Sequence, residues 1–209
     1  MRTGATVVRM ALTLLVLLLL GEGTVSAWSA EPAAPPAHVP WRVRHELNRA
    51  EAILRRGSAR LPPELQVLRG TDFVVLRIPV RLLFNPDSDQ LRPALRAAEV
   101  LALPITLLRQ RHRLMTRIEV YSDNIGGQQM NADLSARRAI TLGNALLSAG
   151  IAARRVQAYG RGFAQALAAN DTAEGRMLNR RVEFTFARVG SAAASAGIMP
   201  VPAAGRAGG

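Results

Sequence analysis

The sequence predicts an α/β two-layer sandwich, in which a mixed β-sheet carries helices on one of its faces. Between residues 70 and 187, segments with the two-residue periodicity of strands alternate with segments of helical periodicity. The predicted order is strand, helix, strand, helix, strand, short helix, strand. Alternation of this kind is typical of a sheet with helices packed on it. The rest of the 209 residues flank this one domain.

The first 27 residues have the pattern of a secretory signal peptide. Arg2 and Arg9 provide positive charge, and residues 10–20 are an unbroken apolar run. Small residues up to Ala27 predict cleavage before Trp28. Crossing a bilayer takes about 20 apolar residues, so the run is short for a transmembrane helix. The alternative is an uncleaved N-terminal anchor.

Charge and composition limit the partners. The chain has a formal net charge of +12, which attracts polyanions. Nucleic acid is not expected, because the chain has an export signal and only 4% aromatic residues, too few for base-stacking surfaces. We therefore expect anionic polymers of the cell envelope as partners. Because there is no cysteine, we expect neither disulfides nor a lipid-modified cysteine.

Three segments lie outside the predicted domain. Residues 28–42 form a linker rich in proline and alanine, which favours a stiff, extended chain. Residues 43–57 form a short amphipathic helix that we expect to pack on the domain. Its apolar residues recur at helical spacing: Val43, Leu47, Ala50 and Leu54. Residues 188–209 are mostly small residues with little charge, and we expect them to be disordered.

The domain begins with an extended segment at residues 72–84. Val80, Leu82 and Phe84 alternate there, which predicts one buried face. Pro79 has no N–H to donate, so it is expected at an edge or a bulge. A turn at residues 85–88 follows, and then a helix over residues 92–112.

The remaining elements follow in the same alternation. Pro104 is expected to kink or divide the helix at 92–112. A strand over residues 116–122 leads to a helix over residues 131–149, for which Asn131 is a suitable N-cap. Three further elements are predicted: a short strand at 156–159 ended by the glycines 160 and 162, a helical turn within 170–179, and a last strand at 181–186.

The domain is organised around residues 121–138, YSDNIGGQQMNADLSARR. Asp123 ends a strand, and the following helix carries a stripe at offsets 0, 3, 4 and 7. The stripe consists of Asn131, Leu134, Ser135 and Arg138. Asp123 and Arg138 can therefore face one pocket, a carboxylate and a guanidinium placed to hold a zwitterion. Spacing also allows two structural alternatives: the two residues pair with each other, or Asp123 caps the turn at Gly126.

Three sequence stretches resemble the OmpA-like C-terminal domain family, which includes Pal and MotB. SDNIGGQQMNADLSARRA is similar to the pattern TDxxG…NxxLSxxRA, and GRGFAQALAANDTAEGRMLNRRVEF is similar to GxG…AxNxTxxGRxxNRRVEI. VRLLFNPDSDQLRP is similar to LFDFDSAxLxP. The resemblance covers roughly residues 70–187, and its motifs occur in the family's order and spacing.

The resemblance implies non-covalent binding of peptidoglycan through the meso-diaminopimelate of its stem peptide. In the family, the Asp of TDxxG and the Arg of LSxxR hold the free amino and carboxylate groups of that residue, and they match Asp123 and Arg138. Family pocket positions also match Asn131, Leu134 and Arg180, with Ser122 in place of the usual Thr. Asp87 lies in a loop that borders the family's pocket, although the loop sequence departs from the pattern.

The resemblance implies a binding protein of the periplasm that can associate with the outer membrane, and it does not imply an enzyme. A second hypothesis is a structural part of an envelope-spanning secretion or motor complex, anchored by an uncleaved N-terminus. No nucleophile motif and no metal-ligand spacing is present, so neither a catalytic residue nor a metal or other cofactor is expected. One departure concerns the site itself, because Val120 precedes it where a glycine is usual.

Overall fold

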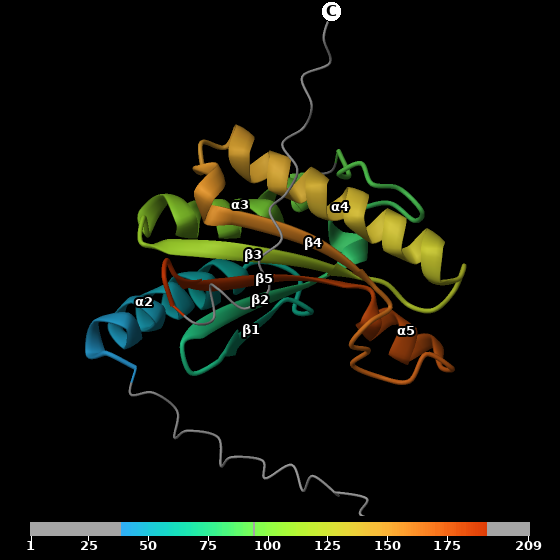
Figure 1. Cartoon of the computed structure of the whole chain (residues 1–209), viewed down its shortest axis with the longest axis horizontal. Coiled ribbons are helices and arrows are strands. Elements are labelled where there is room, and N and C mark those ends of the chain that lie inside the picture. Colours follow the sequence, from blue (N-terminus) through green and yellow to red (C-terminus); the bar gives the residue numbers. More distant parts are fainter. Residues whose placement is uncertain (1–38, 94, 192–209) are drawn as a thin grey trace, which may run out of the picture. The chain divides into compact units, whose positions relative to one another are not determined.

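The computed structural model describes residues 39–93 and 95–191 (Figure 1). The predicted signal peptide, the linker up to residue 38 and the tail from residue 192 lie outside the described residues. In the described ranges, no helix has the length and apolar character needed to cross a membrane.

Five strands form one mixed sheet with the order β1-β2-β5-β3-β4. β3 and β4 are parallel, and every other neighbouring pair is antiparallel. The strands are β1 (Gln66–Arg69), β2 (Phe73–Pro79), β3 (Leu114–Tyr121), β4 (Val156–Gly162) and β5 (Arg181–Arg188). The parallel pair is joined by a helical crossover, and β5 lies between β2 and β3 in the middle of the sheet.

The helices are α2 (Trp41–Ser58), α3 (Leu95–Gln110), α4 (Gln128–Ser148) and α5 (Ala173–Asn179), with 3-10 turns at Val80–Leu82 and Ala153–Arg155. Side chains from α2, α3 and α4 share one core with the sheet. Leu47, Leu107 and Leu146 come from these three helices, and all are fully buried together with Leu76 and Phe184 of the sheet. The predicted α/β two-layer sandwich is therefore confirmed.

The start of the domain differs from the prediction in two ways. The four-residue strand β1 was not predicted, because so short a segment shows no periodicity. The strand expected over residues 72–84 ends at Pro79, and the chain turns into a 3-10 helix at Val80–Leu82. Proline cannot donate to the ladder, and Val80 N instead donates to Arg180 O at 3.0 Å.

The helix after β3 begins three residues earlier than predicted. Its N-cap is Gly127, whose φ of 84° suits glycine, so Asn131 lies inside the helix. Gly160 and Gly162, predicted to end the third strand, belong to β4. A Cβ on Gly160 would lie 2.2 Å from Ala136 N, so glycine is needed there for α4 to approach the strand closely.

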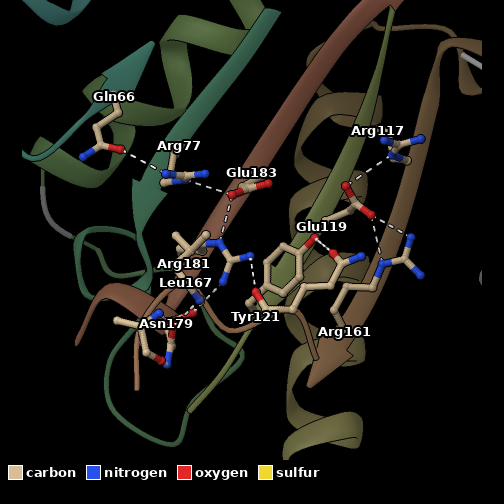
Figure 2. Close-up of polar contacts among 12 residues, drawn as sticks. Gln66, Arg77, Arg117, Glu119, Tyr121, Arg161, Leu167, Asn179, Arg181 and Glu183 are labelled. Atoms are coloured by element: carbon tan, nitrogen blue, oxygen red, sulfur yellow. Dashed lines mark hydrogen bonds and ion pairs between the residues drawn. The ribbon is translucent and has the colours of Figure 1, made fainter. Parts of the chain in front are cut away.

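A polar network covers the sheet face opposite the helices (Figure 2). Glu119 and Glu183 lie directly opposite each other in the β3–β5 ladder. Each carboxylate is held by two arginines, which offsets the repulsion between like charges. The pairs are Glu119 with Arg117 and Arg161, and Glu183 with Arg77 and Arg181.

Candidate functional site

The carboxylate of Asp123 lies just beyond the end of β3 and is buried, with 6% of the residue exposed. Ser122 N donates to Gly162 O at 2.7 Å, so the backbone still follows β4 at this point. Oδ1 of Asp123 accepts the N–H of Ile125 at 3.1 Å, and Oδ2 forms an ion pair with Arg180. Asp123 therefore caps the glycine turn, as one structural alternative expected, and also has a charged partner.

Arg180 supplies the positive charge that pairs with the Asp123 carboxylate. It follows α5 directly and precedes β5, and its carbonyl accepts from Val80 N. Its side chain is 44% exposed. Asp123 thus pairs with Arg180, and the predicted alternative of a direct Asp123–Arg138 ion pair is wrong.

Arg138 is buried on α4 and holds the loop that follows the Val80–Leu82 turn. Its Nε donates to Ser88 O at 2.7 Å and its Nη2 to Asn85 O at 3.1 Å. The guanidinium carbon lies 5.3 Å from the centre of the Phe84 ring, a cation–π geometry. Nη1 donates to none of the described residues, so its N–H groups are available to an anion.

The charges around Arg138 act in opposite directions. Burial lowers the pKa of Arg138, whereas the carboxylates of Asp87 and Asp89 raise it. Asp87 itself is exposed in the turn, with a φ of 51°. Arg137 forms an ion pair with Asp89 at 3.1 Å, so two consecutive arginines of α4 hold the same loop.

Asn131 ties the glycine turn to α4. Its Nδ2 donates to Ile125 O at 2.7 Å and to Gly127 O at 2.9 Å, while its Oδ1 accepts from no described residue. Ile125 in turn donates to Asp123, so Asn131 and Asp123 fix the two sides of one turn. Leu134 is half-buried one helical turn further along α4.

Ser122 adds an unsatisfied polar atom beside Asp123. The residue is 8% exposed, and its buried hydroxyl has no hydrogen-bond partner among the described residues. Buried polar atoms are almost always paired in native structures, so such an atom calls for an explanation. The Ser122 hydroxyl is therefore an unpaired polar atom on the residue next to Asp123.

The described residues hold no group of three or more metal-ligating side chains. A hollow of about 550 Å³ lies beside the turn, lined by residues 126–130, Asp133 and Arg137. The side chains of Asp123 and Arg138 do not line it. The hollow therefore borders the candidate site and does not include its charged groups.

Comparison with known proteins gives the family. Residues 83–180 match the OmpA family. This chain contains an OmpA family domain. The resemblance inferred from the motifs is confirmed, and domains of this kind bind their ligand without catalysis.

The chain also resembles individual proteins, in sequence and in fold. The probable lipoprotein YiaD of Escherichia coli K12 is 34% identical over 58% of this chain and 55% of its own length. The peptidoglycan-binding protein ArfA of Mycobacterium tuberculosis H37Rv is 34% identical over 49% of this chain and 31% of its own length. This chain therefore spans about half of the first relative and a third of the second.

The structural neighbours cover more of the chain. A putative MotB-like protein from Desulfovibrio vulgaris has a TM-score of 0.63 and 27% identity, over 71% of this chain and 95% of the other. The cell wall anchor of the T6SS from Pseudomonas aeruginosa has a TM-score of 0.55 and 28% identity, over 68% and 96%.

One residue that shapes the domain, Asn179, was not singled out from the sequence. Asn179 is fully buried, and its side chain accepts from Leu167 N at 2.7 Å and Ala168 N at 3.1 Å, so it shapes the loop before α5. Its only signal was its place in the NRR motif. Gly160, which was predicted only to end a strand, lies opposite Val120 in the β3–β4 ladder. Gly160 allows α4 to approach β4 closely, whereas Val120 on β3 is fully buried in the core.

Proposed function

We propose that this domain binds peptidoglycan non-covalently through the meso-diaminopimelate of the stem peptide. The observation that carries the proposal is the pair of buried opposite charges, Asp123 and Arg138, mounted on one strand–turn–helix unit. Diaminopimelate presents an ammonium and a carboxylate at its free end, which complement these two groups. Both residues are held by several hydrogen bonds, so the site is ordered before the ligand arrives.

Each predicted residue has a role in this proposal. Asp123 receives the ligand ammonium beside the Ser122 hydroxyl and Asn131 Oδ1, both of which have unused acceptor capacity. Arg138 offers Nη1 to the carboxylate. Arg180, already paired with Asp123, adds positive charge at the rim. Leu134 and Asp87 border the site.

The relatives support the wall as the target. ArfA is named as a peptidoglycan-binding protein, and the T6SS protein is described as a cell wall anchor. With the predicted export signal, they favour a periplasmic protein that tethers the wall to the envelope, with the outer membrane as one attachment. Similarity to the T6SS anchor also favours the second candidate, a wall-binding part of an envelope complex.

Binding to purified sacculi tests the proposal. Two charge-assisted contacts of about 1.5–3 kcal/mol each, with weaker ones, correspond to roughly micromolar affinity, about −8 kcal/mol. Asp123→Asn keeps the shape but loses the charge, and Arg138→Lys keeps the charge but loses the fork. Each is expected to weaken co-sedimentation at least about tenfold. Free meso-diaminopimelate should compete with the wild-type protein.

Two neighbours on α4 serve as matched controls. Asp133 is exposed and, among the described residues, accepts only from Gln129 on its own helix. Arg137 pairs with Asp89 on the surface. Asp133→Asn and Arg137→Lys should bind like wild type. Undiminished binding by both Asp123→Asn and Arg138→Lys would contradict the proposed site.

A further inference from the structure

A second site candidate lies at the opposite end of the sheet. A hollow of about 470 Å³ is lined mainly by basic side chains, and we call it the arginine hollow. Its basic residues are Arg42, His112, Arg113, Arg154, Arg155 and Arg188. Positive charge is thus concentrated in a concave place, where the field on an approaching anion is strongest.

Four separate parts of the fold bring these residues together. Leu114 pairs with Arg188 in the β3–β5 ladder, and Val189 N donates to Arg113 O at 3.0 Å. Arg155 comes from the 3-10 turn before β4, and Arg42 from the first turn of α2. In Figure 1, the start of α2 lies at one end of the sheet and α5 at the other. The hollow and the Asp123 region are thus separated by the length of β3.

Arg155 forms the buried part of the hollow. Its Nε donates to Leu114 O at 2.6 Å, and its Nη2 donates to Leu108 O and Arg111 O, both at 2.8 Å. Burial lowers the pKa of Arg155, and the charge of Arg154 lowers it further. In the described part of the chain, this positive charge is therefore compensated only by carbonyl dipoles.

Among the residues that the structure describes, the arginines lining the hollow have no acidic partner. In the described ranges, none of the five forms an ion pair, whereas arginines on the open sheet face are paired with Glu119 or Glu183 (Figure 2). Unpaired like charges around one hollow repel one another. A bound anion would relieve this repulsion, and guanidinium groups match phosphate oxygens in both geometry and charge.

We propose that the arginine hollow binds the phosphate groups of an anionic lipid surface. Two apolar residues at its margin favour a membrane over a small soluble ion. Trp41 is 62% exposed with the Arg42 guanidinium 5.5 Å from its ring centre, and Val189, which lines the hollow, is 53% exposed. Exposed tryptophan beside arginine is typical of the membrane–water interface.

The arginine hollow and Asp123 lie at opposite ends of β3. β3 has 8 residues, so the hollow and Asp123 lie roughly 26 Å apart along the strand at about 3.3 Å per residue. One domain can therefore contact a membrane at one end and another ligand at the other. Lipid binding does not depend on the proposed peptidoglycan function.

Vesicle co-sedimentation of the full chain tests the inference. The probe vesicles contain phosphatidylglycerol and phosphatidylcholine at about 3:7, and pure phosphatidylcholine vesicles measure binding by other parts of the chain. Arg113→Gln/Arg154→Gln is the test variant, because both side chains are exposed and make no hydrogen bond in the described part of the chain. Arg60→Gln/Arg96→Gln is the control, with the same loss of charge at two exposed arginines outside the hollow.

The expected result is specific to the hollow. A basic side chain near an anionic surface contributes about fivefold to binding, so the loss of two should make the test variant bind the anionic vesicles about twenty-five-fold more weakly than the control variant. Added salt should weaken wild-type binding. Equal binding by the two variants would overturn the inference.

A second arm identifies the source of the phosphate. Pyrophosphate binding is measured by calorimetry for wild type and both variants. Loss of pyrophosphate binding together with loss of vesicle binding in the test variant supports the lipid surface. Loss of pyrophosphate binding with unchanged vesicle binding overturns the lipid assignment in favour of a soluble phosphate ligand.

Discussion

Arg137 and Arg138 are consecutive residues of α4 that hold the same loop, and we predict very different costs for their removal. Methionine at either position keeps most of the aliphatic stem and removes only the guanidinium. The pair Arg137→Met and Arg138→Met therefore isolates the contribution of the charged group at an exposed and at a buried place.

The structure gives a magnitude for each. Arg138 loses two charge-assisted hydrogen bonds, to Ser88 O and Asn85 O, and its cation–π contact with Phe84. The freed carbonyls lie in a solvent-accessible loop and regain water, which leaves a net loss of about 2–4 kcal/mol in the free energy of unfolding. Arg137 loses one surface ion pair with Asp89, with a side chain 54% exposed, worth about 0–1 kcal/mol.

Urea unfolding followed by circular dichroism measures the two free energies. Hydrogen exchange over residues 85–89 reports the loop directly, and Arg138→Met should increase it while Arg137→Met should leave it near wild type. Equal destabilisation by the two variants, or a loop still protected in Arg138→Met, would refute the idea that the buried arginine holds the loop. Such a result would also remove the preorganisation invoked for ligand binding.

Three further predictions concern the frame of the domain. Gly160→Ala should lower the free energy of unfolding by about 1–3 kcal/mol or more, because the new methyl would meet the α4 backbone, whereas Gly143→Ala, whose Cβ would lie an ordinary 3.5 Å from Ala158, should not destabilise in the same urea titration. Burial raises the pKa of Tyr121 from 10.0 to about 12, so the folded state holds that proton more tightly. Stability should be intact below about pH 10 and fall by roughly 2–3 kcal/mol as the pH rises to about 12, and Tyr121→Phe should remove this part of the pH profile. Asn179→Ala leaves the N–H groups of Leu167 and Ala168 without their acceptor and should cost about 2–4 kcal/mol, with faster proteolysis of the loop before α5 than in wild type.

The sequence by itself determined the fold class and most of its elements, because periodicity is a local property. Alternating residues marked the strands, and a stripe at helical spacing marked the face of α4 that carries Asn131, Leu134 and Arg138. Motif order also indicated the family. Periodicity missed β1 because that strand has only four residues. It also misplaced the end of β2 and the start of α4, because these boundaries depend on the backbone geometry of Pro79 and Gly127.

Only the tertiary structure decided the partners of the charged groups. Asp123 pairs with Arg180 across 57 positions because β5 lies next to β3 in the sheet, and Arg138 reaches the loop at Asn85 and Ser88 because α4 packs beside it. The arginine hollow also depends on tertiary packing, since the strand register and the position of α2 bring together residues from position 42 to position 188. Contacts between residues so distant in sequence depend on how the elements pack, and no local pattern specifies them.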